Sequence, residues 1–327
     1  MAKPPTLLVL SVIAPLIALV GISRVTGQTQ GENAERQATA NSSSLEQRIA
    51  QEIALIRDGE RRGLEPLKMG RLWAYLASDY QDGMDFAKSE VAYDHALRLM
   101  EPLPKAQKDY ASVLSNLGSL YLMSGKFDES ERCRKQALAV REAIGNKLEI
   151  ARGKVLLAEV YLAWHKYKTA HQEALEGYTE MVALKDPNMS EVIYALVTLI
   201  DAECFHGECA AGLEHAREAL SLARSTFAAD SREVGQAHLA LGFAECKTGM
   251  KDGPDEEMRA GTEIMKARKS LRHPYARSAL EQYRRYLVSV HRKQEAREIA
   301  QELAQFEGAQ PKACSNCTVS VSGLQEK

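Results

Sequence analysis

The sequence lacks an excess of charge of either sign. Its 327 residues carry 42 Lys and Arg against 44 Asp and Glu, which gives a formal net charge of −2. A nucleic-acid-binding protein usually has a basic excess or a basic face, so this composition does not favour that class. Proline is sparse at 10 residues, aromatic residues make up only 6%, and long β-branched runs are absent after the N-terminus. Abundant Ala, Leu, Glu, Arg and Gln favour helices, and the composition predicts an all-α protein.

Motifs of a nucleophile, a metal site or a phosphate-binding loop are also lacking. The glycines do not cluster after a strand, as a phosphate-cradling loop requires. The eight histidines are scattered, and His165 and His291 fall at predicted turns, where a surface role is favoured over catalysis. Nothing in the chain assembles a base, a nucleophile and an oxyanion donor. We therefore predict that the protein is not an enzyme and uses no cofactor and no metal.

The N-terminal residues 1–27 have the pattern of an export segment. Lys3 precedes an uncharged run from Leu7 to Ile22, which is shorter than the roughly 20 apolar residues of a spanning helix. Val25 and Gly27 offer small or medium residues for a cleavage site. We predict either a cleaved signal peptide or an uncleaved membrane anchor, which would place the remainder in the periplasm or outside the cell. The alternative is an apolar helix of a cytosolic domain.

Residues 28–44 are polar and predict a disordered linker. Ser44 and Gln47 have the spacing of a capping box, which predicts a helix that begins at Leu45. Its apolar face ends near Gly59. Residues 45–68 are thus expected to form a capping helix or a degenerate repeat.

Residues 111–142 hold two amphipathic helical patterns around a turn at Gly125. Leu117 and Tyr121 in the first pattern and Phe127 in the second recur at helical spacing. Gly118 and its small counterparts on the second helix, which are Ser130 and Ala137, let the two backbones approach closely. A single hairpin of this kind cannot bury its own apolar face, so it is expected to recur.

The hairpin recurs along the chain at a regular period. Each unit contains an equivalent pair of adjacent residues. These pairs are Leu76-Ala77, Leu117-Gly118, Leu157-Ala158, Leu199-Ile200, Leu241-Gly242 and Tyr283-Arg284. Successive pairs are separated by 41, 40, 42, 42 and 42 residues. This regularity predicts six units near residues 70–104, 111–144, 151–184, 193–226, 235–268 and 277–307.

The unit resembles the tetratricopeptide repeat, in which an aromatic or Leu, a Leu-Gly or Leu-Ala pair, a Tyr and a Gly turn follow in order. The period exceeds the 34 residues of the usual repeat and is similar to that of kinesin light chains, as are Asn116-Leu117 and His273-Pro274. The resemblance implies a right-handed α-solenoid of about six helix-turn-helix units over residues 69–307, with a disordered tail at 308–327. Glu203 and Glu245 depart from the pattern, because Tyr is usual there.

In such a solenoid the first helices line a concave face that binds a segment of a partner. Asn116 and Arg152 match two positions of the carboxylate clamp of chaperone-binding members, but the other clamp positions hold Ala74, Ser78 and Leu156, so we reject chaperone-tail recognition. The partner-binding groove implied by the resemblance comprises Arg71, Ser78, Ser112, Ser115, Asn116, Ser119, Arg152, Glu159, Tyr194, Asp201, Gln236, Phe243 and Arg285.

Cysteine spacing leaves three readings open around the fourth unit. Cys204 and Cys209 flank its turn, and Cys246 lies one period after Cys204. In an exported protein a Cys204–Cys209 or Cys204–Cys246 disulfide is one reading. Small apolar residues in helix contacts are the second. A zinc site from these cysteines and His206, with unusual spacing, is the third.

Three further cysteines carry less information. Cys314 and Cys317 form a CxxC in the tail, where no following helix would depress a thiol pKa, so a tail disulfide or an incidental pair is favoured over a redox site. Cys133 is expected to be buried and inert.

The sequence thus predicts a non-enzymatic scaffold of an extracytoplasmic compartment that binds a protein or peptide, not nucleic acid. The alternatives are a self-assembling scaffold and an accessory subunit with a redox-active C-terminal CxxC. Neither the partner nor the oligomeric state follows from the sequence.

Overall fold

The computed structural model describes residues 44–250, 253–268 and 274–307, and every regular element within these ranges is a helix. The prediction of an all-α chain is therefore confirmed. A short 3-10 helix, Pro104–Ala106, precedes α5, and the α-helices are α2 (Leu45–Arg62), α3 (Pro66–Asp82), α4 (Phe86–Met100), α5 (Gln107–Met123), α6 (Phe127–Ile144), α7 (Lys147–Ala163), α8 (Tyr167–Val182), α9 (Met189–His206), α10 (Cys209–Thr226), α11 (Arg232–Thr248), α12 (Pro254–Ala267), α13 (Pro274–Ser289) and α14 (Lys293–Glu307).

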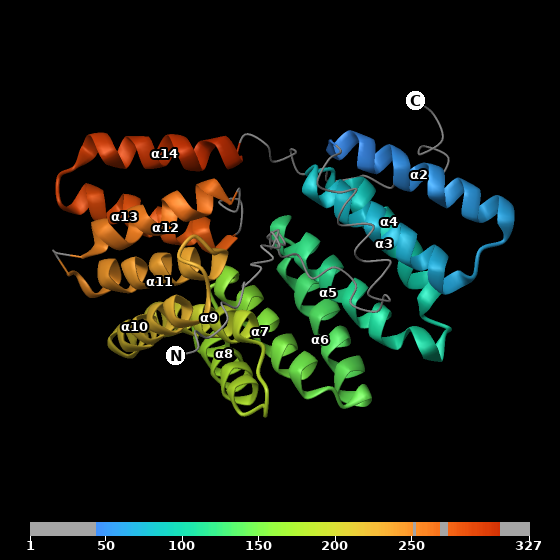
Figure 1. The fold of residues 1–327 in the computed structure, drawn as a ribbon, viewed down its shortest axis with the longest axis horizontal. Coiled ribbons are helices and arrows are strands. Elements are labelled where there is room, and N and C mark those ends of the chain that lie inside the picture. The colour runs from blue at the N-terminus through green and yellow to red at the C-terminus, as the bar shows by residue number, and fades with distance from the viewer. Residues whose placement is uncertain (1–43, 251–252, 269–273, 308–327) are drawn as a thin grey trace, which may run out of the picture.

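From α3 onwards the helices pair into six hairpins, units one to six, which begin with α3, α5, α7, α9, α11 and α13. Each helix packs against its neighbours along the chain, and α2 packs on α3. In Figure 1 the hairpins follow one another round an arc from α2 to α14. This is the predicted α-solenoid of six helix-turn-helix units.

Helix α2 begins where the capping box placed it. The Ser44 hydroxyl accepts from the Gln47 amide at 3.3 Å, and the Gln47 side chain accepts from the Ser44 amide at 2.9 Å. The helix runs past the expected end near Gly59 to Arg62, because the left-handed residue that closes it is Gly63, with φ 63°. Position 59 requires a glycine for a different reason, because a Cβ there would lie 2.7 Å from the Met69 sulfur.

Small residues hold the two helices of unit two together, as predicted. A Cβ on Gly118 would lie 2.8 Å from Cγ of Arg134. Ser130 is fully buried and donates its hydroxyl to the Gly118 carbonyl at 2.7 Å. Ala137 is also fully buried. The small side chains therefore set the spacing between α5 and α6.

The turns need a left-handed residue, and not all units use glycine for it. His165 and His291 adopt φ values of 58° and 63° at the predicted turn positions. In unit one the left-handed residue is Met84, with φ 62°, whereas Gly83 has φ −81°. A Cβ on Gly83 would lie 3.1 Å from Leu45, so this glycine makes room for α2.

The apolar core is divided rather than continuous. One large cluster runs through units three to six, and another joins units one and two. First helices contact each other directly at α3–α5, α7–α9, α9–α11 and α11–α13, whereas α5 and α7 make no comparable contact. The junction between units two and three is thus the place where apolar packing between first helices is interrupted.

None of the helices in the described part of the chain is long and apolar enough to span a membrane. The predicted export segment at 1–27, residues 28–43 of the predicted linker, and the tail with Cys314 and Cys317 lie outside the described residues.

Candidate partner-binding face

Ion pairs join consecutive first helices near their N-terminal ends. Arg71 on α3 donates to both carboxylate oxygens of Asp109 on α5, at 3.3 and 3.0 Å. Arg152 on α7 lies 3.4 Å from the carboxylate of Glu191 on α9. Side chains in these two pairs are 4 to 21% exposed, so solvent screens them less than surface pairs. Two residues of the predicted groove, Arg71 and Arg152, are therefore held in fixed positions.

Arg134 fills the interrupted junction between units two and three. Its side chain is 2% exposed and its Nη1 lies 3.0 Å from Glu159 Oε2. The guanidinium also donates to the Leu156 carbonyl and, at 3.1 Å, to the Ser119 hydroxyl. The second carboxylate oxygen of Glu159 accepts from the Tyr194 hydroxyl. A residue of α6 thus links α5, α7 and α9, and we call this set the Arg134 network.

The planar guanidinium suits this place because its donors fan out in a fixed geometry towards several acceptors. A buried charge is tolerated only when it is paired and hydrogen-bonded. Burial raises the pKa of Tyr194 well above its ordinary value, and the nearby charge of Glu159 raises it further. The phenol therefore stays protonated and can keep donating to Glu159.

Asp201 occupies the same position in unit four that Glu159 occupies in unit three, 42 residues later. The position of Arg134 is taken one unit later by Ala174, which cannot supply a charge. Burial raises the pKa of Asp201 to about 8, and the charge of Glu159 contributes to the same shift. Asp201 is therefore mostly protonated at neutral pH.

The structure brings Ser119, Glu159 and Tyr194 of the predicted groove together but withdraws others from solvent. Phe243 is fully buried and packs against Phe205 with ring centroids 5.5 Å apart, so its assignment to an open groove is wrong. Packing between adjacent helices covers much of the face that was predicted to line the groove. The same burial, with 4 to 8% exposure, applies to Ser78, Ser112, Ser115, Asn116, Asp201 and Gln236.

Arg285 is the exposed exception in unit six, with 65% of its side chain accessible, and it pairs with Glu281 on its own helix at 3.1 Å. The sequence reasoning missed Arg134, because it considered only first helices. A signal was present, since the equivalent positions in units one, three and four hold Tyr93, Ala174 and Ala216. A lone Arg in that series marks a buried cation.

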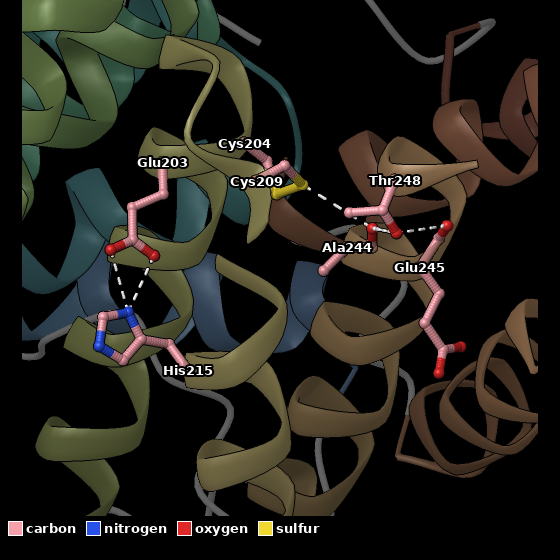
Figure 2. The surroundings of a disulfide bond; sticks show 7 residues. All are labelled: Glu203, Cys204, Cys209, His215, Ala244, Glu245 and Thr248. Carbon is pink, nitrogen blue, oxygen red and sulfur yellow. Dashed lines mark hydrogen bonds and ion pairs between the residues drawn. A yellow bond between two sulfur atoms is a disulfide. The ribbon is translucent and has the colours of Figure 1, made fainter. Parts of the chain in front are cut away.

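A disulfide between Cys204 and Cys209 joins the end of α9 to the start of α10 (Figure 2). Cys246 is free, and burial raises its thiol pKa to about 12. The Cys204–Cys246 alternative is therefore wrong, and so is the cysteine-based zinc site, because a disulfide offers no thiolates. Beside the disulfide, the two carboxylate oxygens of the buried Glu203 lie 3.0 and 2.9 Å from His215 Nδ1.

Cys133 is buried on α6, as predicted. Burial raises its thiol pKa to about 11. The thiolate is the reactive form of cysteine, so this thiol is poorly reactive at neutral pH.

Residues 69–143 and 109–179 match the tetratricopeptide repeat family. The matched stretch, residues 69–179, covers units one to three. The match confirms the repeat type inferred from the sequence pattern. No curated protein matches the chain in sequence.

Solved structures share the fold at low identity. RapI in its apo form has a TM-score of 0.66 and 13% identity, covering 80% of this chain and 92% of its own. A Rap protein complexed with competence and sporulation factor has a TM-score of 0.53 and 12% identity, covering 85% and 90%. A putative kinesin light chain from Podosopora anserina, with nearly identical TPR-like repeats, has a TM-score of 0.51 and 14% identity, covering 63% and 98%. Such identities establish the solenoid fold alone.

Proposed function

We propose that this protein is a non-enzymatic scaffold that binds a protein or peptide through the face formed by its first helices. The Arg134 network carries the proposal. It holds Glu159 and Tyr194, which are half-buried rather than sealed, in fixed positions on neighbouring helices. Polar groups that are already ordered bind a partner without a further loss of side-chain entropy.

The chemistry of this face fits an extended segment with polar and basic groups. Glu149, Glu159 and Glu191 project from consecutive first helices with 16 to 22% of each side chain exposed, and Arg152 lies among them. Carboxylates can accept hydrogen bonds from a partner's backbone amides or cationic side chains. The complex of a Rap protein with competence and sporulation factor supports a ligand-binding role for a solenoid of this shape.

Capture from extracytoplasmic extracts followed by quantitative binding tests the proposal. The full chain serves as bait beside Arg152→Ala and Glu159→Gln, with Arg61→Ala on α2 as the matched control, because that side chain is 77% exposed and remote from the network. We expect one captured partner whose affinity falls at least tenfold in both face variants and is unchanged in the control. Equal affinity across all four proteins would overturn the assignment of the face.

We also propose that the protein acts in an extracytoplasmic compartment, secreted or tethered by its N-terminal segment. The predicted leader supports this, as does the Cys204–Cys209 disulfide, because disulfides persist in oxidising compartments. Alkylation of intact cells followed by mass spectrometry is expected to find both cysteines blocked from reaction until a reductant is added. Free thiols at both positions in growing cells would refute the location.

Self-assembly is a second candidate, supported by apolar side chains at the far end of the solenoid. Val288 and Val290 on unit six are 46% and 37% exposed, which would suit a contact with another copy. Light scattering is expected to show a dimer that Val288→Glu converts to a monomer. A wild-type monomer at high micromolar concentration would exclude this candidate.

A further inference from the structure

A side-chain clamp, in which an acid of one unit contacts a Tyr and a Lys of the next, is found at the first two junctions between units. Between units one and two, Tyr121 and Lys126 both contact the Glu90 carboxylate, at 2.9 and 3.2 Å. Between units two and three, Tyr161 and Lys166 contact the equivalent Glu131, at 2.8 and 4.0 Å. The acid comes from the second helix of one unit, and the other two residues come from the end of the next first helix and its turn.

The clamp changes its chemistry between units three and four. One period after Glu131 the chain carries His171, and one period after Lys166 it carries Glu208. These two still meet, with His171 Nε2 3.8 Å from Glu208 Oε2. The basic residue, His171, now lies on the second helix, and the acid, Glu208, lies at the turn of the next unit. Both are of types that ligate metal ions.

A second imidazole joins this pair. The ring of His206, the last residue of α9, lies edge-on to the His171 ring with centroids 5.3 Å apart. One nitrogen or oxygen atom from each of His171, His206 and Glu208 falls within 4.8 Å of the others. Ligands of a tetrahedral Zn²⁺ lie about 3.3 Å apart, so binding requires side-chain rotation, for which His206 and Glu208 are exposed.

The backbone that carries two of these residues is held in place from both sides. His206 and Glu208 lie inside the short loop closed by the Cys204–Cys209 disulfide. The residue between Cys204 and His206 is Phe205, whose ring stacks on Tyr167 with centroids 5.2 Å apart. Tyr167 is one helical turn before His171 on α8, so these contacts position the loop against the third ligand.

We propose that His171, His206 and Glu208 form a Zn²⁺ site that ties unit three to unit four. Two imidazoles and one carboxylate are a ligand set that suits Zn²⁺, with the fourth position left to solvent or to a partner side chain. Ca²⁺ and Mg²⁺ are not expected to bind, because they prefer oxygen ligands. The site shares only His206 and the surrounding turn with the cysteine-based zinc site that the spacing left open.

The test is titration of the untagged full chain with ZnCl₂ after removal of metal by a chelator. The chain carries Cys314→Ser and Cys317→Ser, because tail thiols would bind zinc independently. We expect one Zn²⁺ per chain at micromolar affinity, unaffected by excess Mg²⁺ or Ca²⁺. His171→Ala and His206→Ala are each expected to weaken binding at least tenfold. His165→Asn, at the exposed turn of unit three, is the matched control and should bind as the parent does.

Two results of the titration would contradict the proposed site. Failure to bind Zn²⁺ at millimolar concentration, or binding that survives both His171→Ala and His206→Ala, overturns the site. Replacing both Cys204 and Cys209 by Ser tests the contribution of the closed loop and is expected to weaken binding severalfold. Unchanged affinity in that variant would show that the disulfide does not position the ligands.

Discussion

The two–three junction, where α6 meets α7, and the three–four junction, where α8 meets α9, place different chemistry on the same backbone. At the first, Arg134 on the second helix neutralises Glu159 on the next first helix. At the second, Ala174 takes the place of Arg134. The equivalent acid, Asp201, is mostly protonated at neutral pH, because burial raises its pKa to about 8. The repeat geometry therefore determines which positions meet, but not whether a buried acid there is paired with a cation or protonated.

The C-terminal ends of the first helices α7 and α9 also differ in the partners that their side chains contact. Tyr161 at the two–three junction reaches back to Glu131 of the preceding unit. Glu203 at the three–four junction turns to His215 of its own unit instead, and the turn beyond it is closed by a disulfide. Unit three is thus tied to unit two by side-chain hydrogen bonds, whereas the turn of unit four is held covalently.

The largest expected effect comes from removing the buried cation of the two–three junction. Arg134→Ala leaves Glu159 without its guanidinium and is expected to lower the free energy of unfolding by about 3–5 kcal/mol. Urea unfolding followed by circular dichroism measures this. The exposed neighbour Arg132 is the control, and its replacement by Ala should change stability by less than about 0.5 kcal/mol. Equal effects of the two changes would show that the Arg134 network does not stabilise the junction.

In the turn of unit four, replacing both Cys204 and Cys209 by Ser is expected to lower the free energy of unfolding by about 2 kcal/mol, because the unfolded chain gains the entropy of an open loop. The difference from the wild-type protein should disappear when both are unfolded in the presence of reductant. A difference that persists in reductant would mean that the serines, rather than the lost cross-link, destabilise the turn.

Tyr161→Phe probes the hydrogen bond that unit four lacks. The change removes a hydroxyl that donates to a carboxylate at 2.8 Å and is expected to lower stability by about 1–2 kcal/mol. Tyr167→Phe is the comparison, because its hydroxyl lies at an exposed position beside His165. A cost for Tyr161→Phe no larger than that for Tyr167→Phe would remove the proposed link between units two and three.

Asp201→Asn tests the protonated acid of the three–four junction. Because the folded pKa of about 8 exceeds the ordinary 3.8, this carboxyl contributes stability that is complete below about pH 4 and is lost as pH rises through 8. Asn resembles the protonated form and cannot ionise. The variant should therefore gain stability over wild type between pH 5 and pH 8, by at least about 1 kcal/mol. Urea midpoints that keep a constant difference across this range would contradict the assignment.

The smallest effect is expected at Glu245, which takes the Tyr position in unit five. One of its carboxylate oxygens is buried without a hydrogen-bond partner. Burial raises its pKa to about 7, and the charge of Glu257 contributes. Stability from this group is lost as pH rises through 7, so Glu245→Gln should stabilise the protein at pH 8 and not at pH 4. The gain, measured by the same urea midpoints, should be smaller than for Asp201→Asn.

Much of the fold was predictable because packing positions recur. The spacing of the paired residues located six hairpins, and the small residues at Gly118, Ser130 and Ala137 identified the close helix contacts. The predicted groove fared less well at Phe243 and Asn116, because the periodic pattern gives the side of a helix but not how closely neighbouring helices cover it. Arg134 was missed because it lies on a second helix, whereas the groove was predicted from first helices alone.

The sequence by itself determined the helical hairpins and the start of α2, since each depends on residues within one or two helical turns. It also determined the period, because the same residue types recur every 40 to 42 residues. Only the tertiary structure decided which cysteines pair, which acids are neutralised and which polar residues remain within reach of a partner. Those outcomes depend on the distance and burial between side chains on different helices, such as Cys204 and Cys209 on α9 and α10 or Arg134 and Glu159 on α6 and α7. A repeat brings such side chains together at every junction, and the local residues at each junction then decide what forms there.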